Sequence, residues 1–179
     1  IQSLLNLVKM RAPAPTCIVE IGGGTAPVLD ILHSFVPGAR CIGFDISEVA
    51  IEANRECLPS IEWVCANVVT EGLYLDDGIA GFVYSSHLIE HLEDPWALLE
   101  EQMRICQPGG IVAIAAPLHM YHREHKQVLT IDAVVGMLKD YAPPVMCFVD
   151  ARQTEIVAGV IKPCRWDCGH NPAKWKKRR

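Results

Sequence analysis

Short apolar runs that alternate with amphipathic stretches are the feature that most constrains how this chain can fold. Strands that are buried on both faces of a parallel sheet are apolar along their whole length. Five such runs occupy residues 17–21, 41–45, 63–66, 80–85 and 110–116. Because amphipathic stretches separate them, the order predicts βαβ units and five parallel strands.

The amphipathic stretches predict five helices, at residues 1–9, 27–35, 48–57, 95–105 and 131–141. The helix at 95–105 has the clearest signals. Asp94 is a typical N-cap, Pro95 suits the first helical position, and Trp96, Leu99 and Met103 fall on one face. The sequence Gln-Pro-Gly-Gly at 107–110 is expected to end this helix.

After residue 144 the pattern changes. Apolar runs at 145–149 and 155–161 are too close together for a crossover helix between them, so they are expected to pair antiparallel. The sequence therefore predicts a doubly wound α/β fold with a seven-stranded sheet, five strands parallel and a terminal antiparallel pair, and helices on both faces. Residues 1–163 are expected to form this domain, and 164–179 an irregular basic extension.

Composition fits one core and excludes several classes of protein. Half of the 179 residues are hydrophobic, and the net charge of −5 gives no reason to expect a nucleic-acid binder, apart from weak contacts by the basic tail at 174–179. No apolar run approaches the ~18 residues of a membrane span. The eight cysteines lie largely in apolar stretches and are interpreted as buried thiols, which favours a reducing, cytoplasmic location.

A glycine-rich turn follows the first predicted strand and opens a helix. Glu20 precedes Gly22, Gly23 and Gly24, and Asp45 ends the next strand about 20 residues further on. Glycines allow a ligand to approach the backbone, and an acidic strand end suits a ribose hydroxyl pair, so the pattern indicates an adenosine-type cofactor.

The residues around this turn favour one such cofactor over another. A dinucleotide fingerprint would have a third glycine where this chain has Pro27, which lacks the N–H that would face a pyrophosphate. Glu20 would repel a diphosphate but suits a cationic amino group. The pattern therefore points away from NAD and towards S-adenosylmethionine (SAM).

Four segments in this order resemble the class I SAM-dependent methyltransferases of the small, stand-alone type: 19–25, 43–47, 86–95 and 107–111. The resemblance implies that Glu20 and the loop Gly22, Gly23, Gly24 line the methionine half of SAM. It also implies that Asp45 binds the ribose hydroxyls.

The resemblance assigns further cofactor contacts. Ile46 is expected to pack on adenine, and Asn67, where the family commonly has Asp, to accept a hydrogen bond from the adenine amino group. Ser86 and His87 are expected to line the cofactor near the methyl group. His87 is also a candidate general base, because histidine titrates near neutral pH.

A second group of histidines follows the fifth strand. His119 and His122 are candidates for a catalytic base, and Tyr121 and His125 for substrate contact, because loops at this position cover the acceptor in similar proteins. The alternative is that these side chains lie on a solvated loop and have no role in the site.

Two patterns could suggest a metal site. The string His87-x-x-Glu90-His91 matches the spacing of the family's loop-to-helix segment, and a structural or cofactor-lining role is favoured over metal ligation. Cys164, Cys168 and His170 lack a fourth ligand of matching spacing and are interpreted as incidental. No metal is expected.

The predicted function is methyl transfer from SAM to an oxygen or nitrogen of a small molecule. A SAM-binding regulatory module without catalysis, and an NAD(P)-dependent oxidoreductase, are the alternatives. The sequence does not identify the acceptor, because fold analogy does not supply it.

Overall fold

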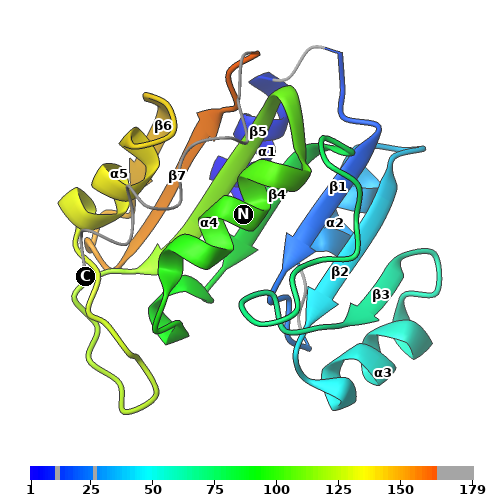
Figure 1. Ribbon diagram of the computed structural model, residues 1–179, viewed down its shortest axis with the longest axis horizontal. Helices are drawn as coiled ribbons and strands as arrows, with labels where there is room; N and C mark the ends of the chain where they lie inside the picture. Colours follow the sequence, from blue (N-terminus) through cyan, green and yellow to red (C-terminus); the bar gives the residue numbers. More distant parts are fainter. Residues whose placement is uncertain (11–12, 26–27, 165–179) are drawn as a thin grey trace.

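The computed structural model describes residues 1–10, 13–25 and 28–164. Its centre is a seven-stranded sheet in the order β3-β2-β1-β4-β5-β7-β6 (Figure 1). The strands are β1 (Cys17–Ile21), β2 (Arg40–Asp45), β3 (Glu62–Cys65), β4 (Ala80–Ser86), β5 (Cys106–Pro117), β6 (Pro144–Val149) and β7 (Glu155–Ile161). Strands β1 to β5 are mutually parallel, β7 runs antiparallel to β5, and β6 runs antiparallel to β7. The predicted sheet is confirmed.

Helices cover both faces of this sheet. They are α1 (Gln2–Met10), α2 (Leu29–Phe35), α3 (Glu48–Cys57), α4 (Pro95–Ile105) and α5 (Ile131–Lys139), with a short 3₁₀ helix η1 (Ile89–His91) after β4. Helices α4 and α5 share one apolar cluster, and α1, α2 and α3 share the other. Ser47, Asp94 and Thr130 each accept a backbone N–H at a helix start, as their residue types predict.

Helix α4 ends at Ile105, as predicted, but the fifth strand begins earlier than expected. Strand β5 starts at residue 106 rather than 110, so the stretch 107–110 belongs to the strand. The N–H of Gly109 donates to the carbonyl of Lys162, and the N–H of Lys162 donates to the carbonyl of Gly110. The register against β4 shifts between Ala80 and Phe82, so the extra residues are absorbed in a bulge of β5.

The expectation of buried cysteines is only partly correct. Cys17, Cys41 and Cys106 are buried free thiols. Cys57, Cys65, Cys147 and Cys164 are free but exposed. The exposed ones lie at a helix end, on the edge strands β3 and β6, and after β7, where apolar sequence does not imply burial on both sides.

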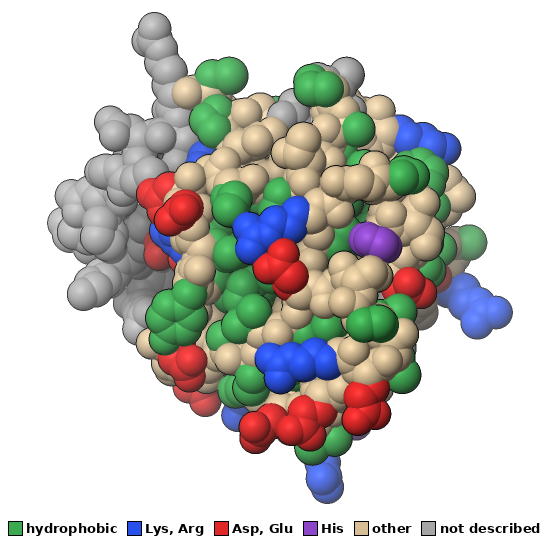
Figure 2. All heavy atoms as spheres, turned by 90° about the vertical axis from the view of Figure 1, so that its right-hand side faces the viewer, with side chains coloured by type: hydrophobic (Ala, Val, Ile, Leu, Met, Phe, Trp, Pro, Cys, Tyr) green, Lys and Arg blue, Asp and Glu red, His purple; other side chains and the backbone are tan. Residues whose placement is uncertain are grey.

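Strand β3 forms one edge of the sheet. Arg40 on the neighbouring strand donates two hydrogen bonds to the Glu62 carboxylate, at 2.7 and 2.8 Å. The face on that side of the molecule carries acidic and basic side chains intermixed (Figure 2). Charged residues of this kind protect an edge strand from pairing with another chain.

Arg104, in the last turn of α4, holds the long connection between β3 and β4. Its guanidinium donates to the carbonyls of Leu73 and Leu75, each at 2.8 Å, and pairs with Glu101 and Asp77. We call this arrangement the Arg104 clamp. The segment that it anchors begins at Asn67, which lies in the site described next.

None of the helices in the described residues is long and apolar enough to cross a bilayer.

Candidate functional site

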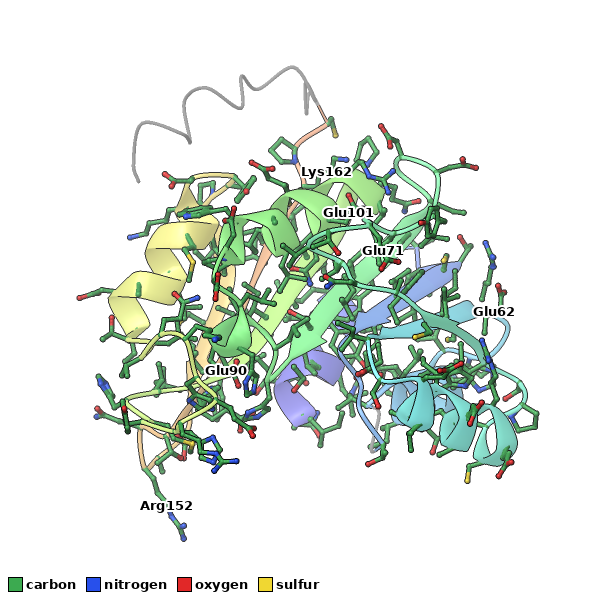
Figure 3. The ribbon with its side chains drawn as sticks, turned by 60° about the horizontal axis from the view of Figure 1, so that its bottom comes forward. Glu62, Glu71, Glu90, Glu101, Arg152 and Lys162 are labelled. Carbon is green, nitrogen blue, oxygen red and sulfur yellow. The ribbon has the colours of Figure 1, made fainter. Side chains whose placement is uncertain are left out.

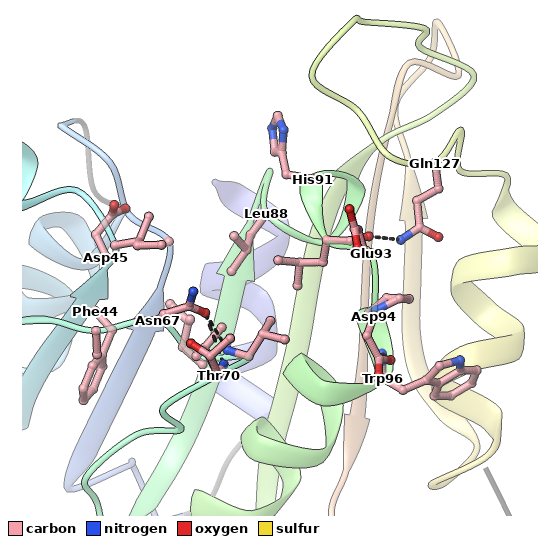
Figure 4. A pocket seen from close by; sticks show the side chains of 18 residues that line it. Phe44, Asp45, Asn67, Thr70, Leu88, His91, Glu93, Asp94, Trp96 and Gln127 are labelled. Carbon is pink, nitrogen blue, oxygen red and sulfur yellow. Dashed lines mark hydrogen bonds between the residues drawn. The ribbon is translucent and has the colours of Figure 1, made fainter. Parts of the chain in front are cut away.

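A cavity of about 840 Å³ opens at the carboxyl ends of β1, β2, β3 and β4 (Figure 4). This is the edge where the strand order reverses between β1 and β4, the place at which doubly wound sheets bind ligands. The residues that line it include Gly22, Asp45, Ile46, Asn67, Thr70, Leu88, His91, Glu93, Asp94, Trp96 and Gln127.

The glycine turn forms one wall and is held rigidly. Gly22 has φ +78°, donates to the carbonyl of Phe44 at 2.7 Å, and a Cβ added there would lie 3.0 Å from Leu88 Cδ2. Gly24 has φ +54° and accepts a hydrogen bond from Asn54 Nδ2 at 2.8 Å. Both positions favour glycine for conformational reasons.

Asp45 lies at the end of β2, half-buried in the cavity wall. Its Oδ2 accepts the N–H of Gly24 and its Oδ1 accepts the N–H of Ser47, each at 2.8 Å. A carboxylate has about four acceptor sites, so each oxygen retains a lone pair for a further donor. Ile46 beside it is 68% exposed and offers an apolar surface.

Asn67 lines the same cavity, but its hydrogen bonds differ from the sequence prediction. Its Oδ1 accepts the N–H groups of Val69 at 3.0 Å and Thr70 at 3.3 Å. These bonds use both lone pairs of the amide oxygen. The Nδ2 group, a donor, is therefore what Asn67 can offer to a base.

Glu20 lies behind the glycine turn, outside the set of described residues that line the cavity. It is 1% exposed, and its two oxygens accept the N–H groups of Val28 at 3.1 Å and Leu29 at 3.0 Å, at the start of α2. Burial raises the pKa of Glu20 to about 7, although the two N–H groups act in the opposite direction. Pro27, which bore on the choice of cofactor, lies outside the described residues.

The raised pKa of Glu20 predicts a pH-dependent stability. Between pH 4.5 and 7 the folded protein keeps this carboxyl protonated while the unfolded chain loses the proton, so the free energy of unfolding should fall as the pH rises. The expected contribution is up to about 3 kcal/mol. Urea titrations from pH 4 to 8 measure it, and Glu20→Gln should flatten this part of the profile. A variant profile that falls as steeply as that of the wild type would contradict the assignment.

His87 lies just after β4, in a left-handed conformation with φ +51°. Its Nε2 is 3.4 Å from Glu155 Oε1 and its Nδ1 is 3.7 Å from Glu90 Oε1. Of the described residues, neither His87 nor the half-buried Ser86 is among those that line the cavity. The structure places the imidazole beside β7.

The loop after β5 reaches the cavity through a residue that was not predicted, and the four predicted residues of this loop are not among the described residues that line it. His119, Tyr121 and His122 are exposed, with Tyr121 at 86%, whereas His125 is half-buried. Gln127 on this loop lines the cavity and donates to the carbonyls of Ile89 and Leu92.

His91 also lines the cavity, and its ring contacts that of His125 edge-on at 4.9 Å between centroids. The sequence predicted a structural or cofactor-lining role for the string that contains His91, but no role for Trp96 or Gln127. His91 lies in the segment 86–95 and Trp96 directly follows it. Their position in or next to a segment that resembles the family could have indicated a place in the cavity. Cys168 and His170 lie outside the described residues.

The fold and the cavity define an α/β protein that holds a nucleoside-type cofactor at the switch point of its sheet. The family described as "Methyltransferase domain" matches residues 19–114, just over half of the chain. The chain belongs to this family, within the class I SAM-dependent methyltransferases.

The curated relatives include methyltransferases of greater length. The trans-aconitate 2-methyltransferase of Azoarcus sp. is 27% identical over 120 residues, 67% of this chain and 46% of that protein. The malonyl-[acyl-carrier protein] O-methyltransferase of Hahella chejuensis is 30% identical over 112 residues, 61% of this chain and 38% of that protein. The chain thus spans less than half the length of these relatives.

The solved structure of the N-methyltransferase NodS from Bradyrhizobium japonicum, in complex with S-adenosylhomocysteine, has the same fold. Its TM-score is 0.71 at 16% identity, over 90% of this chain and 85% of that one.

Proposed function

We propose that this protein transfers a methyl group from SAM to an oxygen or nitrogen of a small-molecule acceptor. The observation that carries the proposal is the charge of the cavity. Its lining includes the carboxylates of Asp45, Glu93 and Asp94, and no lysine or arginine of the described residues. Such a wall favours the sulfonium and ammonium groups of SAM and disfavours the pyrophosphate of NAD(P).

The residues present fit this cofactor. Gly22 lines the cavity with backbone alone, and Asp45 retains acceptor sites for two ribose hydroxyls. Ile46 and the Nδ2 group of Asn67 would contact the adenine. Glu20 would act through the backbone, by fixing the start of α2 behind the turn.

When bound, SAM supplies an electrophilic methyl group on its sulfonium. The protein's contribution is to orient the acceptor and exclude water, because displacement at the methyl depends mainly on alignment. Trp96, Leu88 and Leu92 provide apolar surface around the cavity for that purpose. His119, Tyr121 and His122, exposed on the loop after β5, are the proposed acceptor contacts.

The names of the relatives support transfer to oxygen or nitrogen, and trans-aconitate is an example of a small acceptor. One is a trans-aconitate methyltransferase and another an O-methyltransferase acting on malonyl-[acyl-carrier protein], while the structural neighbour is an N-methyltransferase. The seven described cysteines are free thiols, which supports a reducing, cytoplasmic location as part of the proposal.

Two experiments test the function in sequence. Calorimetric titration with SAM and with NAD should give saturable binding of SAM alone; binding of NAD alone would favour the oxidoreductase. Incubation with SAM and a panel of carboxylic acids, alcohols and amines, read by mass spectrometry, should then show a mass gain of one methylene unit. Tight SAM binding without any gain across the panel would favour a regulatory module.

A further inference from the structure

A compact cluster of three side chains, Glu90, His91 and His125, lies beside the cavity. One oxygen of the Glu90 carboxylate has no hydrogen-bond donor. Each of the three side chains offers one donor atom, and the three atoms lie within 4.8 Å of one another. Glu90 is 1% exposed, and its Oε2 has no hydrogen-bond partner. Figure 3 shows Glu90 on η1, beside the loop that follows β5. A buried carboxylate oxygen without a donor is costly unless a cation compensates it.

The contacts of the two histidines fix which ring nitrogen carries the proton. His91 Nδ1 lies 3.3 Å from the carbonyl of Glu124, and His125 Nδ1 lies 3.2 Å from the carbonyl of Met120. A carbonyl only accepts, so each Nδ1 is the donor and each neutral ring has its lone pair on Nε2. This tautomer, fixed by a backbone carbonyl, is the usual arrangement of a histidine that ligates a metal.

The histidines beside Glu90 lie beyond hydrogen-bond distance of its carboxylate. His87 Nδ1 is 3.7 Å from Glu90 Oε1. His91 Nε2 and Glu90 Oε1 are 3.8 Å apart, too far for a hydrogen bond and with no proton between them. Lys126 uses its backbone N–H on the carbonyl of Glu90, but its ammonium group pairs with Glu93 at 3.7 Å. Two acceptors therefore face each other around a gap.

We propose that this gap binds one divalent transition-metal ion of the zinc type, with Glu90, His91 and His125 as its ligands. One carboxylate and two imidazoles match a common catalytic zinc set, which leaves a position open. Ligand atoms at 2.0–2.2 Å from a tetrahedral ion lie about 3.4 Å apart, so small side-chain rotations close the present spacing. His125 lies on a loop at the surface, which allows such a rotation.

The position of the ion connects it to methyl transfer. His91 is both a proposed ligand and a lining residue of the cavity, so the open position would be available to an oxygen donor of the acceptor. This part of the inference rests on the proposed function; the binding of the ion does not.

Cobalt(II) is the probe for the site. Titrated into chelator-treated protein, it should give visible d–d absorption that saturates at one ion per chain and is displaced by zinc. Glu90→Gln and His125→Ala should each weaken binding by more than about tenfold. His33→Gln on α2 is the matched control and should bind as the wild type does. Circular dichroism checks that each variant is folded.

Absence of the absorption, or binding that both variants leave unchanged, would overturn the site. Cobalt that binds at Cys164 instead would be unaffected by the Glu90 and His125 variants. Cys164→Ser would then weaken its binding and identify that thiol as the ligand. SAM affinity is measured on the same samples. Wild-type protein that binds SAM but no cobalt rejects only the metal site, and wild-type protein that binds cobalt but not SAM rejects only the proposed function.

Discussion

Replacing Asp45 by alanine is expected to weaken the binding of SAM by about 10²–10⁴-fold. The carboxylate would accept both ribose hydroxyls, and charge-assisted hydrogen bonds contribute about 1.5–3 kcal/mol each. The same side chain holds the N–H groups of Gly24 and Ser47, so its loss also loosens the glycine turn. Calorimetric titration measures the affinity.

Asp76→Ala is the control for this experiment, because Asp76 is an exposed residue of the β3–β4 connection that does not line the cavity. It should bind SAM as the wild type does. An Asp45→Ala protein with a native circular-dichroism spectrum and unchanged affinity would reject the assignment of the ribose site.

Gly43→Ala is expected to lower the free energy of unfolding by about 3 kcal/mol. A Cβ at this position on β2 would lie 2.1 Å from Trp63 Cζ3, a distance at which something must move. The indole cannot turn away freely, because its Nε1 donates to the carbonyl of Leu58 at 3.2 Å. Since Asp45 is two residues further along β2, SAM affinity should fall as well. Urea denaturation measures the first effect.

Gly136→Ala is the matched control. Gly136 lies inside α5, and a Cβ added there meets nothing within 4 Å. Alanine in a helix interior is favoured over glycine by about 1 kcal/mol, so this variant should be as stable as the wild type or more so. A Gly43→Ala protein that unfolds at the same urea concentration as Gly136→Ala would contradict the packing argument.

The sheet could be predicted because its signals are local. Strand β1 (Cys17–Ile21) is buried from end to end, so its largely apolar sequence reflects its surroundings directly. The start of α4 was equally clear, because Asp94 and Pro95 are unambiguous N-terminal residues. The early start of β5, at residue 106 rather than 110, was missed because Gly109 and Gly110 pair with Lys162, more than 50 positions away, and no local pattern records that pairing.

The proximity of the residues that follow β1 and β2 could be predicted from the sequence, whereas that of Glu90 and His125 could not. Gly22 and Asp45 end adjacent strands, so the topology brings them together once the strands are known. Glu90 and His125 are separated by the whole of α4 and β5, and their proximity depends on how the loop after β5 folds back. Burial was also invisible from the sequence, since Glu20 and Glu90 are among the least exposed acidic side chains of the described residues.

The Arg104 clamp has a consequence for the order in which the chain can assemble. Leu73 precedes Arg104 by 31 residues, so the segment that begins at Asn67 cannot be anchored until α4 has formed and docked. A chain that stops before Arg104 would contain the glycine turn, Asp45 and Asn67, yet one wall of its cavity would have no anchor at its far end. We therefore expect cofactor binding to require α4, even though most of the proposed cofactor contacts precede it in the chain.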